Sequence, residues 1–179
     1  MNVNSNSKRK TILLAASTVV KNNGVEKLTL EAVAKEAGVS KGGLLHHFPN
    51  KEALIIGMVE DLTNHFFTNV QDRAMSETVE KGKWSRAITK AMDDDIKEGK
   101  EIGTALLAAL FTNPDILNKF QSQYATWQQN IENDGIDPVR STIIRLAADG
   151  LWYSEMFGLG VLDDELRTKV IQELINMTK

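Results

Sequence analysis

The chain of 179 residues contains no cysteine and only three prolines. Without cysteine it can form no disulfide and offers no thiolate for catalysis or metal binding. The scarcity of proline leaves long stretches without a helix breaker, and these stretches are rich in helix formers. The composition therefore predicts an all-α fold, and the missing disulfide framework is typical of a cytoplasmic protein, which is the location we expect.

Long apolar runs are also absent from the sequence. No stretch approaches the roughly 20 apolar residues that span a bilayer. The N-terminal segment MNVNSNSKRK is polar and basic, and it lacks the apolar core of a signal peptide. We therefore expect neither a membrane segment nor a membrane partner.

Residues that usually carry catalysis are few. The only histidines are His46, His47 and His65, and neither an HExxH motif nor a Gly-rich phosphate loop occurs. Adjacent side chains diverge around a helix, so neither His46–His47 nor the acidic run 93–95 is expected to form a metal site. We predict no catalytic residue, no metal and no cofactor. A catalytic triad assembled from distant residues, in an all-α enzyme with a vestigial N-terminal domain, is the alternative.

The net charge of −3 conceals an uneven distribution. Residues 1–51 carry 8 Lys and Arg against 3 Asp and Glu, which gives 8 − 3 = +5. The remaining residues carry 13 and 21, which gives 13 − 21 = −8. A basic N-terminal part on an acidic body is the asymmetry expected of a DNA-binding domain joined to a domain that does not bind DNA.

The basic part contains a pattern of two short helices joined by a tight turn, between Leu28 and Lys51. Thr29 and Ser40 are suited to cap the two helices, and Gly38 supplies the positive φ that ends the first. One apolar stripe recurs at spacings of three and four, formed by Leu30, Val33, Ala34 and Ala37. Helix, Gly-containing turn and helix form the helix-turn-helix of DNA-binding proteins, in which the second helix enters the major groove.

The second helix, expected over residues 41–48, has one apolar face and one open face. Leu44 and Phe48, four residues apart, are predicted to be buried. Lys41 can donate to phosphate or guanine from the other face, and Gly42 allows close approach of the backbone. A short surface helix of an ordinary bundle is the alternative interpretation of this pattern.

The string AKEAGVSKGGLLHHFPNKEAL (residues 34–54) resembles the N-terminal domain of the tetracycline-repressor (TetR) family of bacterial transcription regulators. The matching positions are Thr29, Val33, Ala34, Ala37, Gly38, Val39, Ser40, Gly42, Leu44, His47, Phe48, Lys51 and Leu54. The resemblance covers about the first third of the chain. One departure is Leu45, which stands where the family usually has a tyrosine that reaches a DNA phosphate. Leu45 cannot donate a hydrogen bond, although it could contact a thymine methyl.

The resemblance implies an N-terminal three-helix DNA-binding domain, residues 1–50, and a C-terminal helical domain, residues 51–179, for effector binding and dimerisation. The DNA contacts that it implies are Thr29, Ser40, Lys41, Gly42, Gly43, Leu45, His46, His47 and Lys51. The basic cluster at residues 8–10 is expected to contact the DNA backbone as well.

About nine helices are expected along the whole chain. Outside the helix-turn-helix, periodicity and capping predict helices over residues 8–23, 51–77, 84–98, 102–111, 114–133, 138–156 and 164–177. Residues 1–7 are expected to be disordered. Gly57 lies inside a predicted helix, where it allows a bend or a close crossing, or is simply tolerated.

The C-terminal part is rich in aromatic and methionine side chains. The general expectation for any one of them is a place in the core. The family resemblance, supported more weakly by the segment ADGLWYSEMFG (148–158), implies an effector pocket and a dimer interface in this part. The ligand-binding candidates are Phe66, Met92, Leu106, Leu110, Trp127 and Trp152. The interface candidates are Ala147, Trp152, Leu166, Val170 and Leu174.

These observations together predict a homodimeric regulator of transcription. A two-turn helix contacts too few bases for useful specificity, so a dimer on palindromic double-stranded DNA is expected. We expect a repressor that a small apolar or amphipathic ligand releases from its operator. A ligand-independent or architectural helix-turn-helix protein is the alternative.

Overall fold

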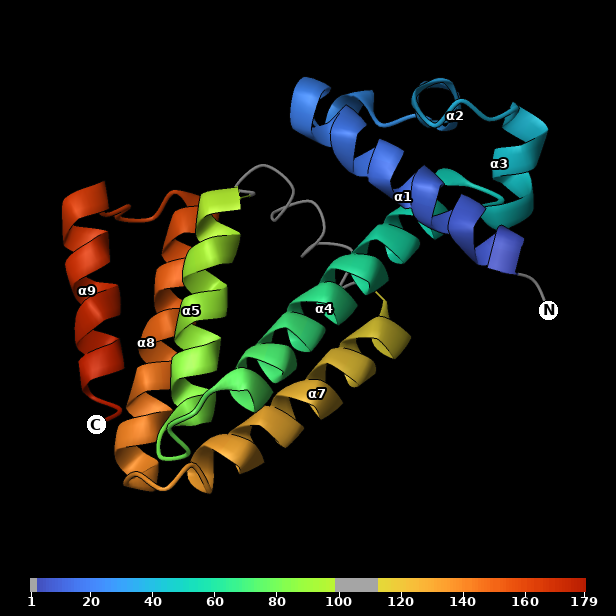
Figure 1. Cartoon of the computed structure of the whole chain (residues 1–179). Helices are drawn as coiled ribbons and strands as arrows, with labels where there is room; N and C mark the ends of the chain where they lie inside the picture. Colours follow the sequence, from blue (N-terminus) through green and yellow to red (C-terminus); the bar gives the residue numbers. More distant parts are fainter. Residues whose placement is uncertain (1–2, 99–112) are drawn as a thin grey trace. The chain divides into compact units, whose positions relative to one another are not determined.

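The computed structural model describes residues 3–98 and 113–179, and every regular element in these ranges is helical (Figure 1). The elements are α1 (Val3–Asn23), η1 (Val25–Lys27), α2 (Leu30–Glu36), α3 (Lys41–His47), α4 (Lys51–Ser76), α5 (Lys83–Glu98), α7 (Pro114–Glu132), α8 (Pro138–Phe157) and α9 (Asp164–Asn176). The predicted all-α class is confirmed. None of the described helices has the length and apolar character needed to cross a bilayer.

The predicted helices agree closely with the observed ones, with two exceptions. The prediction of disorder was wrong for residues 3–7, because α1 begins at Val3. Asn and Ser are only moderate helix formers, but a helix that is already nucleated extends without a second nucleation step. The short 3₁₀ turn η1 was not predicted. The helix predicted over 102–111 lies outside the described residues.

Side-chain caps begin several of the helices, including the two for which the sequence predicted a capping residue. Thr29, Ser40 and Asn50 each accept a hydrogen bond from the amide three residues further on, at 3.1, 3.1 and 2.7 Å. Asp137 and Asp163 do the same for α8 and α9, at 2.9 and 2.7 Å. These bonds satisfy amides that have no partner inside the helix, and each is worth about 1 kcal/mol.

The chain divides into two compact units, and the division falls at Thr63, inside α4. The first unit contains α1, η1, α2, α3 and the first half of α4, and the first residues of α7 group with it. Its core consists of Ile12, Leu13, Ala15, Ala16, Val19, Val20, Leu28, Val33, Ala34, Leu44, Phe48, Leu54 and Met58. Val33 and Ala34 of the stripe predicted for residues 30–37 lie in this core, and Leu30 and Ala37 pack partly buried against it, so local periodicity identified the buried face of α2.

The second unit contains the rest of α4 together with α5, most of α7, α8 and α9. In Figure 1, α5, α8 and α9 lie side by side, although α5 is far from the other two in the sequence. The main core of this unit is formed by Phe67, Val70, Ala74, Ala87, Ile88, Ala91, Met92, Trp127, Ile131, Ile136, Ile144, Ala148 and Leu174. A satellite cluster is formed by Ile96 of α5, Leu151 of α8 and Ile171 of α9.

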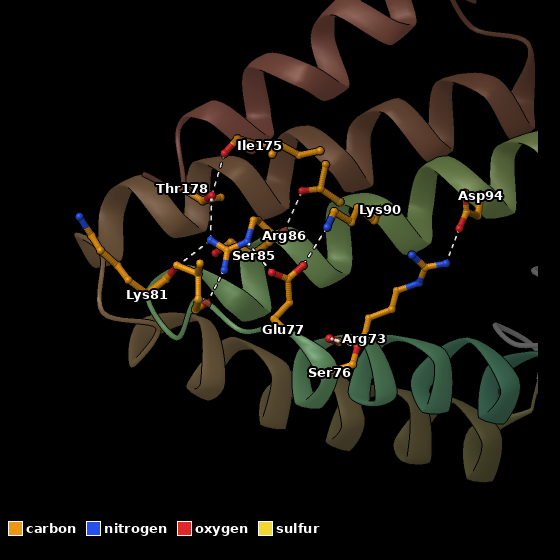
Figure 2. Close-up of polar contacts among 12 residues, drawn as sticks. Arg73, Ser76, Glu77, Lys81, Ser85, Arg86, Lys90, Asp94, Ile175 and Thr178 are labelled. Atoms are coloured by element: carbon orange, nitrogen blue, oxygen red, sulfur yellow. Dashed lines mark hydrogen bonds and ion pairs between the residues drawn. The ribbon is translucent and has the colours of Figure 1, made fainter.

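A polar network joins the end of α4, the start of α5 and the C-terminus (Figure 2). The guanidinium of Arg86 donates to the carbonyl of Lys81 at 2.7 Å, to Oγ1 of Thr178 at 3.2 Å and to Oε2 of Glu77 at 3.2 Å. Lys90 binds the other Glu77 oxygen at 2.8 Å. Arg86 and Thr178 are buried, so these charge-assisted bonds hold the α4–α5 loop and the last residues against α5.

The start of α5 is capped by a residue far away in sequence. The carboxylate of Asp134 accepts bonds from the amides of Trp84 and Ser85 at 2.9 and 2.8 Å, and its carbonyl accepts one from Gly82 at 2.6 Å. Asp134 follows α7 and is only 3% exposed. Because local patterns contain no trace of this contact, only the tertiary structure reveals what begins α5.

Candidate nucleic-acid interface

The turn between α2 and α3 has the backbone geometry that the sequence predicts. Gly38 has φ 65°, which an L side chain rarely adopts. The amide of Val39 donates back to the carbonyl of Ala34 at 3.0 Å, and Val39 packs partly buried against the core. The turn thus satisfies the free carbonyls of α2 and directs the chain into α3.

The second helix, α3, has a buried face and an open face. Leu44 is fully buried and Phe48, directly after the helix, is 3% exposed, as predicted. Lys41, Leu45 and His46 are exposed, and so are both glycines. Leu45 is 36% exposed, so its apolar side chain is available to an apolar group such as a thymine methyl. His47 is half-buried and packs edge to face with the His46 ring at 5.4 Å.

Lys41 is engaged by an acidic residue of the preceding helix. Its ammonium forms an ion pair with the carboxylate of Glu31, which lies in the first turn of α2. The hydrogen bond from Lys41 lowers the pKa of the Glu31 carboxyl. The pair brings together the first turns of α2 and α3, the two places from which a helix-turn-helix contacts DNA.

The other basic residues predicted to contact DNA differ in what they touch. Lys51 is exposed in the first turn of α4, where free amides also point outward. Arg9 lies over the Phe48 ring, 5.2 Å from its centroid, and its guanidinium is 3.6 Å from Glu60. Arg9 therefore supports the core of this unit, while its neighbours Lys8 and Lys10 remain exposed.

The effector candidates are placed by the structure in different surroundings. Phe66 and Trp127 pack edge to face at 5.4 Å, within a cluster that also contains Phe67, Phe120 and Tyr124. Met92 is a fully buried core residue, and Trp152 is half-buried with its indole Nε1 donating to Asp95. Leu106 and Leu110 lie outside the described residues.

Sequence reasoning missed a buried polar group beside these aromatic rings. The hydroxyl of Tyr124 donates to the carboxylate of Asp149 at 3.4 Å, and Arg145 binds the other oxygen at 2.5 Å. Gln128 accepts a bond from Arg145 at 2.8 Å. Burial raises the pKa of Asp149, although the charge of Arg145 opposes the shift. Burial also raises the pKa of the Tyr124 hydroxyl.

The interface candidates divide into buried and exposed residues. Leu174 is 6% exposed and belongs to the core of its own protomer. Ala147, Trp152 and Val170 are half-buried against the same core. Leu166 alone is well exposed, at 47%. In this protomer α9 turns Leu174 toward α5 and α8, and its place in an interface stays a prediction.

A second apolar stripe on α8 was overlooked in the sequence. Val139, Ile143 and Leu146 are 67, 50 and 55% exposed, and Phe157 at the end of the helix is 47% exposed. Their spacings of four and three place Val139, Ile143 and Leu146 on one face. The same periodicity rule that identified buried stripes could have found them, because α8 carries more apolar residues than one buried face requires.

Two helices, a tight Gly-containing turn and an exposed second helix define a helix-turn-helix protein. The family model described as bacterial regulatory proteins, tetR family, matches residues 12–58. A second model, the tetracyclin repressor-like C-terminal domain, matches residues 82–179, which is more than half of the chain. The chain belongs to the TetR family of bacterial transcriptional regulators.

Individual relatives are similar mainly over the N-terminal part. HTH-type transcriptional regulator RutR of Escherichia coli is 43% identical over 56 residues, 31% of this chain and 26% of RutR. Nucleoid occlusion factor SlmA of a Marinomonas species is 30% identical over 78 residues, 44% of this chain and 40% of SlmA. The matched segment thus spans less than half the length of these curated relatives.

Solved structures share the fold along almost the whole chain. The multidrug binding protein EbrR, crystallised with imidazole, superposes with a TM-score of 0.62 at 18% identity, over 97% of this chain and 90% of EbrR. At this identity the similarity concerns the fold alone.

Proposed function

We propose that this chain is a homodimeric repressor that binds a palindromic operator in double-stranded DNA and is released by a small apolar or amphipathic ligand. The observation that carries the DNA-binding part is the exposed face of α3. Lys41, Leu45 and His46 are open to solvent there, while Leu44 anchors the helix in the core. Hydrogen-bond donors and an apolar contact on the open face of a helix are what base contacts in the major groove require.

Charge supports the same proposal. The +5 balance of residues 1–51 coincides with the unit that contains α2 and α3. Lys51, exposed at the start of α4, is suited to a phosphate, and so is Thr29 at the start of α2. We propose the nine residues from Thr29 to Lys51 named above as the DNA contacts, with residues 1–50 as the DNA-binding domain.

Selection of bound duplexes from a random pool, followed by a gel-shift titration against salt, tests the DNA-binding part. We expect an enriched palindrome and an affinity that falls steeply with salt. An absence of any enriched sequence, with no shift at low salt, would refute this part of the proposal.

The dimer part is supported by the exposed stripe Val139, Ile143 and Leu146, together with Leu166 on α9. Exposed apolar residues at helical spacing are typical of a helix that packs against another one. We propose that this face, together with the half-buried Ala147, Trp152 and Val170, meets the same face of a second copy. Sedimentation equilibrium of the whole chain tests it, and a monomer at micromolar concentration would contradict it.

The effector part is supported by the aromatic cluster around Phe66 and Trp127 and the adjacent Tyr124–Asp149 pair. A few polar groups among aromatic side chains are typical of small-molecule sites. EbrR, which shares the fold, was solved with imidazole and is named a multidrug binding protein. We propose Phe66, Met92, Leu106, Leu110, Trp127 and Trp152 as ligand contacts. Thermal stabilisation by members of a compound library, coupled to loss of DNA binding, tests this part.

A ligand-independent DNA-binding protein is the second candidate. One relative, SlmA, is named a nucleoid occlusion factor rather than a regulator of transcription. If DNA binding persists while no compound stabilises the protein, this second candidate is favoured. We propose no catalytic activity, because the features that support DNA binding require none.

A further inference from the structure

The ion pair between Lys41 and Glu31 is placed where the proposed DNA surface would act. Lys41 is the first residue of α3, and Glu31 is the second residue of α2. The side chains are 57 and 64% exposed, so the pair is not part of the core. Exposed pairs contribute little to folding. The ion pair therefore has a small structural role, yet it engages the Lys41 ammonium, which is proposed to bind DNA.

We propose that Glu31 is an intramolecular competitor of DNA, whose carboxylate holds the Lys41 ammonium in the free protein and is displaced when Lys41 binds an acceptor on DNA. This inference rests on the proposed DNA-binding function. It assigns to Glu31 a positioning role that lowers the affinity of the surface for DNA in general.

Two physical effects follow from this arrangement. A carboxylate and a DNA phosphate offer the ammonium the same kind of charge-assisted bond, so one must be given up for the other. Lysine is a compact charge on a flexible stem, which makes such an exchange sterically simple. Once Lys41 has moved, the Glu31 carboxylate remains beside DNA and is repelled by the phosphates. Both effects weaken binding.

The first experiment compares Glu31→Gln with wild type by fluorescence anisotropy. The probes are a random-sequence duplex of about 30 base pairs and the duplex selected from the random pool, over about 50–200 mM KCl. We expect Glu31→Gln to bind both duplexes about 3- to 10-fold more tightly, because no carboxylate has to release the Lys41 ammonium and none then faces the phosphates.

Glu36→Gln is the matched control. Glu36 is the last residue of the same helix, is exposed, and enters no ion pair within the residues that the structure describes. The substitution removes the same charge from the same unit. If competition for Lys41 is the cause, Glu36→Gln changes the affinity less than about 2-fold, as expected for a distant, screened charge.

A double-mutant cycle with Lys41→Ala separates competition from simple repulsion. Repulsion alone gives the same gain from Glu31→Gln whether or not Lys41 is present. Competition adds the lost ion pair, so the gain should be larger by about 2- to 5-fold when Lys41 is present, which is the range typical of an exposed pair. An equal or smaller gain overturns the inference.

The outcomes distinguish the inference from the function on which it rests. If wild type binds DNA, and Glu31→Gln binds it with the same affinity as Glu36→Gln, the proposed function stands and the role of Glu31 is refuted. If neither wild type nor Glu31→Gln binds any duplex at low salt, both are refuted. Tighter binding by Glu31→Gln alone, dependent on Lys41, supports the inference.

Discussion

A side chain added at Gly57 would place its Cβ 2.6 Å from Cε1 of Phe48. Gly57 lies in α4, and Phe48 is the residue that follows α3, so the missing side chain creates the space in which the end of α3 is seated. Arg9 covers the same ring from α1. Of the alternatives for Gly57, a close crossing is therefore the one that the structure supports. The contact between Gly57 and the Phe48 ring therefore holds the end of α3, the proposed DNA-contacting helix, close to α4.

Gly57→Ala should accordingly destabilise the first unit. Alanine gains about 1 kcal/mol of helix propensity, but overpacking against a buried ring costs about 1–3 kcal/mol. We expect a net loss of roughly 1 kcal/mol, seen as faster amide exchange at Leu44 and Phe48. Exchange slower than in wild type would show that the Phe48 ring yields easily.

Gly42→Ala is expected to have the opposite effect on stability. A Cβ at Gly42 meets no atom within 4 Å, and the residue lies inside α3. The substitution should stabilise α3 by up to about 1 kcal/mol, measurable as slower amide exchange in residues 44–47. If the backbone approaches DNA here, the affinity falls while the helix becomes more stable. Unchanged exchange in α3 would contradict this prediction.

Lys51→Ala tests the phosphate contact proposed at the start of α4. A phosphate contact carries no sequence information, so binding should weaken equally on the selected and the random duplex. The salt slope should decrease by roughly one unit. Lys41→Ala, in contrast, should also change sequence preference if Lys41 donates to a guanine. A sequence-dependent loss for Lys51→Ala would mean that Lys51 contacts bases instead.

Leu146→Asp tests the proposed dimer face without disturbing the core. Leu146 is 55% exposed in the protomer, so the substitution leaves the fold intact. In a dimer it would bury an unpaired charge, which is strongly unfavourable. We expect monomers in sedimentation, an unchanged helical circular dichroism spectrum, and loss of binding to palindromic DNA. Gln121→Asp, at an exposed position of α7 outside the proposed face, is the control for one added negative charge, and equal effects of both substitutions would argue against the α8 stripe.

Glu77→Gln should destabilise the second unit in a pH-dependent manner. The hydrogen bond from Lys90, helped by Arg86, lowers the pKa of Glu77. A carboxyl whose pKa is lowered by folding stabilises the native state above its unfolded pKa of about 4.3, and this contribution disappears as the pH falls through the native pKa. We expect a loss of about 1–3 kcal/mol at pH 7.

The difference between Glu77→Gln and wild type should shrink as the pH falls below about 4. Urea titrations followed by tryptophan fluorescence report on this unit, because Trp84, Trp127 and Trp152 all lie in it. A difference that is constant from pH 7 to pH 3 would show that the charge of Glu77 is not what stabilises the network in Figure 2.

The sequence by itself determined the helices and the helix-turn-helix, because both depend on local physics. Thr29, Ser40 and Asn50 cap helices through amides three residues away, and the burial of Leu44 and Phe48 follows from their spacing of four. Gly38 provides the positive φ just after α2, a conformation that glycine adopts without strain. Such features involve residues within one or two turns of each other, so the pattern contains the whole interaction.

Only the tertiary structure decided the features that join distant residues. Asp134 caps the start of α5 although it lies about 50 positions away in the sequence. Glu31 forms an ion pair with Lys41 across the turn. The aromatic and polar groups around Asp149 come from α4, α7 and α8, and no single stretch of sequence shows them together. Leu174 and Leu166 share one apolar pattern on α9, yet one is buried and the other exposed. Periodicity identifies an apolar face, but which neighbour covers it depends on how the helices pack.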